Sequence, residues 1–114
     1  MQTDELPLIS AMTDFYKQFY CYRKLFPKQD RHMLGARCEN YIIVILESLY
    51  RAKYANRADK RQIINAASEN LDLLKAFIRL LHELKIIPES KYLILQNKLQ
   101  EAGKMLGGWI RSCA

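Results

Sequence analysis

The chain has 114 residues, of which half are apolar and 26% are charged, and its formal net charge is +6. A chain of this length can bury a core of its own, so residues 1–114 are expected to form a single domain. Four glycines and three prolines supply too few turns for a sandwich or a barrel, and the composition favours an all-α fold. The positive charge favours solubility and partners that carry phosphates or another anionic surface.

Cysteine spacing and hydropathy exclude several other classes of protein. Cys21, Cys38 and Cys113 form no CxxC pair, which argues against a disulfide framework or a zinc ribbon and favours reduced thiols. The N-terminal segment MQTDELPLIS carries acids where a signal peptide carries cations. The longest apolar run, residues 41–46, is far shorter than the ~20 residues of a membrane helix. We therefore expect a cytoplasmic protein that does not contact a membrane.

Two helices are predicted in the first half of the chain. The first covers about residues 8–25 and stops before Pro27, which cannot continue a helix. The second covers about residues 28–55, and Asn56 is interpreted as the residue that ends it. The apolar spacing of the second helix predicts a core stripe of Leu34, Cys38, Tyr41, Ile45, Leu49 and Ala52.

Two more helices are predicted in the second half. The third covers about residues 60–86, and Asp59 with Gln62 resembles a capping box at its start. The fourth covers about residues 88–111 and is expected to open with Pro88. The seam of the third helix is the most regular in the chain and comprises Ile64, Ala67, Leu71, Leu74, Ile78 and Leu81. Short connections make neighbouring helices antiparallel, so the sequence predicts an up-down-up-down four-helix bundle.

The third helix carries a second line of apolar residues, which we name the apolar stripe. It comprises Leu73, Phe77, Leu80 and Leu84, and the same line continues to Ile87 just beyond the predicted helix. A helix that is apolar on more than one face is expected to be buried on more than one face, and exposed apolar patches usually mark interfaces. We therefore expect the apolar stripe to join subunits of an oligomer. The alternative is a wide core face with a few surface leucines.

Motifs for catalysis and metal binding are absent from the sequence. Neither His32 nor His82 has a partner at metal-ligand spacing, and no P-loop or nucleophile elbow occurs. We expect a protein without enzymatic activity, cofactor or metal site.

Two glycines lie near the end of the fourth predicted helix. Gly103 and Gly107 indicate either a close contact between helices or a helix end near Gly107, with Trp109 folding back on the core.

Two stretches carry a resemblance to a known family. They are LFPKQDRHMLGARCENYIIVILESLYRAKYA, residues 25–55, and KYLILQNKLQEAGKMLGGWIRS, residues 91–112. The chain resembles the accessory variability determinant (Avd) proteins of diversity-generating retroelements, within a four-helix-bundle group that includes the ribosomal-RNA intervening-sequence proteins. The most specific marks are Phe26-Pro27-Lys28, Leu34-Gly35, Arg37, Glu39, Arg51-Ala52, Gly103 and Met105-Leu106-Gly107-Gly108-Trp109. Cys38 stands where the family usually has an aliphatic residue, a swap that a core should tolerate.

This resemblance implies a ring-like homopentamer of basic four-helix protomers. It also implies binding to the reverse transcriptase of the element and to nucleic acid, RNA and possibly DNA, without an active site in this chain. The complex would copy a template repeat into error-prone complementary DNA during mutagenic retrohoming. Two alternatives stay open: an intervening-sequence-type protein associated with ribosomal RNA, and an oligomeric protein-interaction bundle that binds no nucleic acid.

The segment RAKYANRADKR, residues 51–61, holds five cations and one acid between the second and third predicted helices. In the predicted topology the end of the fourth helix lies at the same pole. We therefore expect a basic pole made of Arg51, Lys53, Arg57, Lys60, Arg61, Lys104 and Arg111. Cations attract phosphates without reading bases, so little sequence preference is expected.

Other interpretations of this surface also stay open. The cations can belong to an ordinary solvated turn. The opposite pole has a similar excess of positive charge, with Arg23, Lys24, Lys28, Arg31, Lys85 and Lys91. Tyr50, Tyr54 and Trp109 are interpreted as packing residues, so no platform for stacking bases is expected.

Overall fold

The computed structural model describes residues 5–113, and the side chains of residues 7–113; residues 1–4 and 114 of the predicted domain lie outside this range. In the described range the helices are α1 (Glu5–Arg23), α2 (Lys28–His32), α3 (Leu34–Tyr54), α4 (Arg57–Glu83) and α5 (Glu89–Ser112), and no strand occurs. The predicted all-α fold is confirmed. None of these helices combines the length and the apolar character that a membrane span requires.

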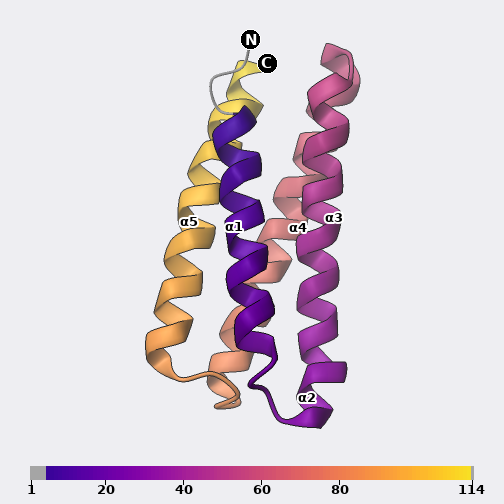
Figure 1. The fold of residues 1–114 in the computed structure, drawn as a ribbon. Helices are drawn as coiled ribbons and strands as arrows, with labels where there is room; N and C mark the ends of the chain where they lie inside the picture. Colours follow the sequence, from indigo (N-terminus) through magenta and orange to yellow (C-terminus); the bar gives the residue numbers. More distant parts are fainter. Residues whose placement is uncertain (1–4, 114) are drawn as a thin grey trace.

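The four long helices form an antiparallel bundle that measures 43 × 22 × 19 Å (Figure 1). α1 and α4 each pack against both α3 and α5, so every long helix has two of the other long helices as neighbours, and α3 also contacts α2. The connection between α3 and α4 lies at the same end of the bundle as the C-terminal end of α5, the upper end in Figure 1. The topology therefore brings residues 51–61 and the last turns of α5 to one pole, as predicted.

The core lies between the four long helices and follows the predicted spacing closely. All six predicted seam residues of α4 are buried: Ile64, Ala67, Leu71, Leu74, Ile78 and Leu81. In α3 the predicted stripe is partly wrong, because Ile42 is buried whereas Leu34 and Tyr41 are only half-buried. Tyr41 lies at the edge of the core, where its ring stacks on that of Phe77 with 5.5 Å between ring centroids.

The connection between α3 and α4 differs from the predicted one. Asn56 is the N-cap of α4: its Oδ1 accepts a hydrogen bond from the backbone N–H of Asp59 at 2.9 Å, and its Nδ2 donates to the Asp59 carboxylate at 3.0 Å. The predictions that Asn56 ends the second helix and that Asp59 caps the third are therefore wrong. An asparagine suits both roles, and here it satisfies a free N–H at the start of a helix. As a result α4 begins at Arg57.

The predicted second helix is interrupted at Met33, which separates α2 from α3. Met33 has φ −102° and ψ −90°. Backbone hydrogen bonds span the interruption, from Met33 N–H to the Gln29 carbonyl at 3.1 Å and from Arg37 N–H to the Met33 carbonyl at 3.0 Å. The sequence gives no signal for this break, since residue 33 is neither proline nor glycine.

The two ends of the connection between α4 and α5 are fixed by backbone geometry. Lys85 has φ 62°, and it follows α4 in the position where helices commonly end in a left-handed residue. The N–H of Ile86 donates to the Leu81 carbonyl at 2.9 Å, which satisfies a carbonyl at the end of the helix. Pro88 precedes α5 as its N-cap, so the prediction that it is the first helical residue is wrong.

The glycines near the end of α5 do not end the helix. α5 continues to Ser112, and Trp109 is buried as one of its helical residues. The interpretation of Gly107 as a helix end is therefore wrong. Gly103 does face α4, since a β-carbon there would lie 3.7 Å from a methyl carbon of Leu71.

Candidate nucleic-acid interface

The basic pole draws its residues from the ends of three helices. Arg51 and Lys53 lie in the last turn of α3, and Arg111 lies in the last turn of α5. Arg57, Lys60 and Arg61 occupy the first turns of α4. Figure 1 places these helix ends together at the upper end of the bundle.

Lys104 lies apart from the other six residues of the basic pole. It is eight residues before the end of α5, roughly 12 Å along the helix axis. There it lines a shallow groove between α4 and α5, together with Gly103, Ser68 and Lys75. Its Nζ lies 3.4 Å from the carboxylate of Glu101, so part of its charge is already neutralised. The structure therefore places Lys104 about two turns before the end of α5 rather than at the pole itself.

The four arginines of the basic pole, Arg51, Arg57, Arg61 and Arg111, are all exposed. Among the ion pairs found within residues 5–113, none includes any of these four. Exposed guanidinium groups without acidic partners are suited to bidentate contacts with phosphate oxygens. The arrangement can therefore attract a polyanion without first breaking an internal ion pair.

The two lysines that complete this pole, Lys53 and Lys60, are half-buried and lie near aromatic rings. Lys60 Nζ is 6.0 Å from the ring centroid of Trp109, which connects the start of α4 to the end of α5. Lys53 Nζ is 5.5 Å from the ring centroid of Tyr54.

The aromatic residues of this pole differ from one another in burial. Trp109 is 1% exposed and packs in the core, as predicted. Tyr50 is 52% exposed and Tyr54 is 81% exposed, so the interpretation of these two tyrosines as packing residues is wrong. Their rings lie in solvent on the last two turns of α3.

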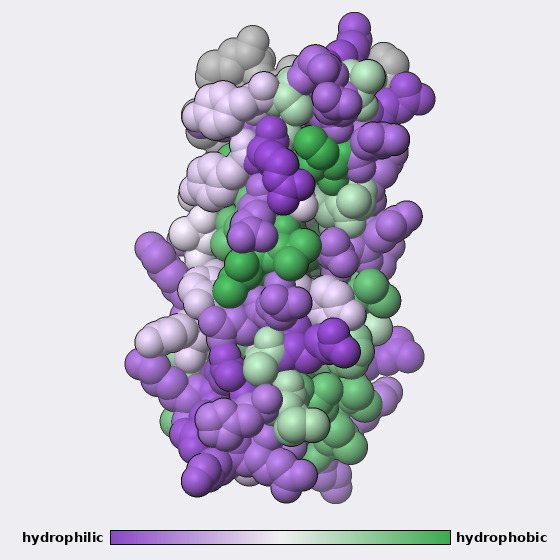
Figure 2. All heavy atoms as spheres, turned by 90° about the vertical axis from the view of Figure 1, so that its right-hand side faces the viewer, coloured by the Kyte–Doolittle hydropathy of each residue, from purple (hydrophilic) through white to green (hydrophobic). Residues whose placement is uncertain are grey.

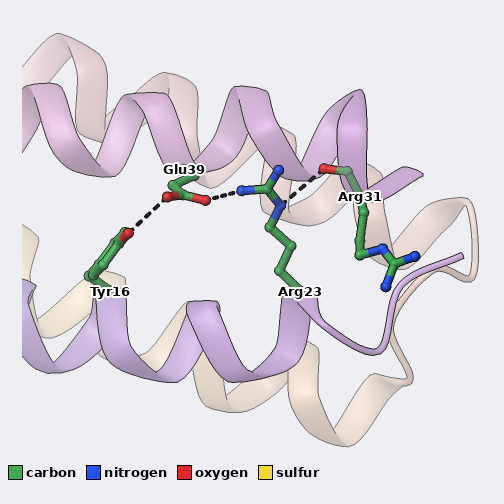
Figure 3. Close-up of polar contacts among 4 residues, drawn as sticks. All are labelled: Tyr16, Arg23, Arg31 and Glu39. Atoms are coloured by element: carbon green, nitrogen blue, oxygen red, sulfur yellow. Dashed lines mark hydrogen bonds and ion pairs between the residues drawn. The ribbon is translucent and has the colours of Figure 1, made fainter. Parts of the chain in front are cut away.

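At the opposite pole, Arg23, one of the six cations named for that pole, is held in an internal network (Figure 3). Arg23 forms an ion pair with Glu39, and its Nε donates to the carbonyl of Arg31 at 3.0 Å. The hydroxyl of Tyr16 donates to the other carboxylate oxygen of Glu39 at 2.8 Å, and this hydrogen bond raises the pKa of Tyr16. Arg23 is thus neutralised within the fold, so the opposite pole has less free positive charge than charge counting indicated.

Gly35 makes room for this network. A β-carbon at this position would lie 3.0 Å from Nε of Arg23 and 3.1 Å from the carbonyl oxygen of Asp30. Both distances are shorter than ordinary van der Waals contacts, so a side chain here would require Arg23 or the backbone at Asp30 to shift by a few tenths of an ångström. Sequence reasoning missed the network, although Gly35 and Glu39 were both among the marks of the family resemblance.

The apolar stripe divides into exposed and recessed residues. Leu73 is 47% exposed and Leu84 is 56% exposed, whereas Phe77 and Leu80 are half-buried. Phe77 and Leu80 line an open groove of about 740 Å³ beside α5. Figure 2 shows apolar areas at mid-height and at the lower right, separated by hydrophilic side chains. Leu73 and Leu84 are therefore accessible from solvent, whereas Ile87, at the end of the same predicted line, is buried in the core, so the prediction that this line is exposed throughout is wrong.

The histidines and cysteines are dispersed. Within residues 5–113, no group of three or more His, Cys, Asp or Glu side chains is placed to hold a metal ion. His82 stacks on Tyr92 with 4.4 Å between ring centroids. Cys21 is exposed, whereas Cys38 and Cys113 are buried, and all three are free thiols. Burial raises the pKa of the Cys38 thiol to about 12.

Comparison with known proteins places the chain in a family. No curated protein shows significant similarity to it. A solved structure of a protein of unknown function from the S23 ribosomal protein family of Bacteroides thetaiotaomicron matches with a TM-score of 0.86. The match covers 96% of this chain and 99% of that one at 19% identity, and it shows a shared fold. The bAvd-like family model matches residues 8–113, so the chain belongs to the bAvd-like family, the bacterial Avd proteins.

Proposed function

We propose that this protein is a non-catalytic accessory subunit that binds nucleic acid and partners the reverse transcriptase of a diversity-generating retroelement. Membership of the bAvd-like family supports the role in a retroelement. The observation that carries the binding function is the set of four exposed arginines at the basic pole, none of which has an acidic partner within residues 5–113. The ligand is RNA, and DNA would bind through the same contacts between arginine and phosphate.

Phosphate contacts explain how such a surface would act. Each guanidinium that binds a phosphate releases condensed counterions, which favours binding at low salt and carries no base sequence. The accessory protein would then hold template RNA and complementary DNA near the polymerase without choosing their sequence. Chemistry would remain with the reverse transcriptase, and this chain would contribute binding alone.

We further propose that the protein acts as a homo-oligomer, a pentamer, joined through the apolar stripe. The exposure of Leu73 and Leu84 supports this, since their apolar side chains are available to another surface. Ring symmetry would repeat the basic pole once per subunit and produce a belt of positive charge. A belt binds a long polyanion more tightly than one pole does, because its contacts are linked.

The binding function is tested by reversing charge at the basic pole. Substituting Arg51, Arg57 and Arg61 together by Glu should weaken the affinity for RNA and for DNA alike, while circular dichroism shows unchanged helicity. If the wild-type pole neutralises about five phosphates, log affinity should fall against log salt with a slope of about −4. Fluorescence anisotropy of labelled oligonucleotides over a salt series measures both quantities.

A matched control makes the same change of charge at the opposite pole. Lys24, Lys28 and Lys91 together substituted by Glu should leave most of the affinity intact. If this control weakens binding as much as the arginine variant, the basic pole is not the site. If the wild-type protein binds no nucleic acid even at low salt, a protein-interaction bundle is the better account.

Association with the polymerase needs a separate experiment. A reverse transcriptase whose gene lies beside the gene for this protein should co-purify with it from cells that express both. A gene neighbourhood without a reverse transcriptase and without a template–variable repeat pair would instead favour the intervening-sequence alternative.

A further inference from the structure

Two solvent-exposed tyrosines lie on one face of α3 at the basic pole. Tyr54, at 81%, is the most exposed large hydrophobic side chain of the described residues, and Tyr50 is 52% exposed. They are four residues apart, so both project from the same side of the helix, with a rise of about 6 Å between them. Two aromatic rings therefore stand one above the other on a helix surface.

Most other aromatic rings in the structure have a packing partner that accounts for them. Tyr41 stacks on Phe77, Tyr92 stacks on His82, and Trp109 is buried. Within residues 5–113, neither Tyr50 nor Tyr54 contacts another aromatic ring. No aromatic ring of the described residues therefore covers either tyrosine, and Tyr54 has a cation, Lys53, over one face only, which leaves ring surface open to a planar ligand.

The charges around these rings suit a ligand that carries phosphates. Lys53 Nζ lies 5.5 Å from the ring centroid of Tyr54. Arg51 is three residues before Tyr54 on the same helix, and Arg57 is three residues after it in the first turn of α4, and both are exposed. Glu47, an exposed acid one turn before Tyr50, marks the limit of the positive surface along α3. Aromatic faces and cations thus occur side by side, as they do in grooves for single-stranded nucleic acid.

We propose that this face of α3 binds single-stranded nucleic acid, with unpaired bases stacked on Tyr54 and Tyr50 while Arg51 and Arg57 contact the phosphates. The proposal rests on the proposed function and specifies its substrate class. Every base has a π face, so stacking adds affinity without adding sequence preference. In a duplex the faces of each base are covered by neighbouring base pairs, and only the phosphate contacts remain. The protein should therefore prefer single strands to duplexes.

Tyrosine substitutions test this proposal on the full-length protein. The double substitution Tyr50→Ala and Tyr54→Ala should weaken binding to a labelled 12-nucleotide RNA by about tenfold or more. Binding to a duplex of the same sequence should change by less than about twofold, because stacking makes no contribution there. The conservative pair Tyr50→Phe and Tyr54→Phe keeps both rings and should retain the wild-type affinity for each ligand.

Tyr20 supplies a matched control at the other pole. It is also exposed on a helix, and Lys24 Nζ lies 4.6 Å from its ring centroid. Tyr20→Ala should leave the affinity for single strands unchanged. Ultraviolet cross-linking of the RNA, followed by mass spectrometry, should identify Tyr54 or Tyr50 rather than Tyr20 as the attached residue.

The outcomes separate this proposal from the function on which it rests. If the double alanine variant weakens single-strand and duplex binding equally, or weakens neither, stacking on α3 is refuted. The proposed function then still stands, provided that charge reversal at the basic pole weakens the binding of both ligands. If the wild-type protein binds neither ligand at low salt, both proposals fail together.

Discussion

At the scale of single residues, Gly35 determines how α1 meets α3. It lies where any side chain would press against Arg23, so its missing β-carbon allows the guanidinium to reach Glu39. Glu39 also accepts the hydrogen bond from Tyr16, and the three side chains connect the two helices. Partly buried charges are stable only with such partners, since an unpaired one loses its hydration without compensation.

Substituting Gly35 by Ala should destabilise the fold by about 1–3 kcal/mol, because the new methyl group displaces Arg23 or the backbone near Asp30. Gly107→Ala is the matched control: its β-carbon would have only a terminal nitrogen of Arg111 nearby, at 3.5 Å. Alanine favours a helix over glycine, so this control should stabilise the fold by about 0.5–1 kcal/mol. Urea denaturation measures both, and changes of the same sign would contradict the account.

Cys38 should make stability depend on pH in alkaline solution. The thiol of the unfolded chain ionises near its ordinary pKa of 9.0, whereas the buried thiol keeps its proton up to about pH 12. The folded state therefore loses up to about 1.4 kcal/mol per pH unit through this window, and the contribution is fully present below pH 9. Cys38→Val should reduce this loss while leaving stability at pH 7 within about 1.5 kcal/mol.

The measurement for Cys38 is the free energy of unfolding in urea at pH 7, 9 and 10.5. The difference between the wild type and the valine variant at each pH isolates the contribution of the thiol. Identical pH dependence in the two proteins would show that the thiol is not shielded from solvent.

At the scale of helices, the ends of α4 are fixed by local backbone chemistry. Asn56 caps its start, and the left-handed Lys85 follows its end. A left-handed conformation is strained for a residue with a β-carbon, so Lys85 is held there by the hydrogen bonds around it rather than by its own preference. The end of α4 thus has a site where glycine suits the backbone better.

Lys85→Gly should therefore stabilise the fold by about 0.5–1 kcal/mol. Lys98→Gly is the control, since Lys98 is an exposed residue in the middle of α5 and glycine there should cost about 1 kcal/mol. Both changes remove one exposed lysine, so only the backbone conformation distinguishes them. Thermal unfolding that shifts the two midpoints in the same direction would be inconsistent with the left-handed geometry.

The buried side of a helix could be predicted from the sequence more accurately than the residues at which a helix begins and ends. The spacing of Ile64, Leu71 and Ile78 predicts which side of α4 faces the core. These residues lie along one side of a straight helix, so only one rotation of the helix buries all of them. Asn56 was ambiguous, since the same amide can cap a start or follow an end. The break at Met33 could not be predicted, because neither proline nor glycine stands at this position.

At the scale of the whole molecule, the apolar stripe specifies how an assembly could be disrupted without unfolding the subunit. Leu73 and Leu84 are exposed, whereas Phe77 stacks on Tyr41 and contributes to the fold. Leu73→Glu with Leu84→Glu should therefore convert the proposed oligomer to monomers at unchanged helicity, measured by multi-angle light scattering. Leu25→Glu, at another exposed leucine between α1 and α2, should leave the mass unchanged. An unchanged mass for the double variant would exclude the stripe as the interface.

The candidate site could be predicted in part. Antiparallel topology alone places the end of α3, the start of α4 and the end of α5 at one pole, so the grouping of the arginines follows from the order of the helices. The exposure of Tyr50 and Tyr54 does not follow, because α3 has apolar residues on nearly every side and its rotation is set by packing. The ion pair between Arg23 and Glu39 could not be predicted either, since a sum of charges does not show which side chains of different helices form contacts.

The distribution of thiols has a practical consequence. Cys21 is exposed near the lower end of α1, whereas Cys38 and Cys113 are shielded inside the protein. A maleimide fluorophore should therefore attach at one position without any engineered cysteine, about a bundle length from the arginines. An affinity tag fused after α5 would instead crowd those arginines, so immobilisation through Cys21 would leave them unobstructed on a sensor surface.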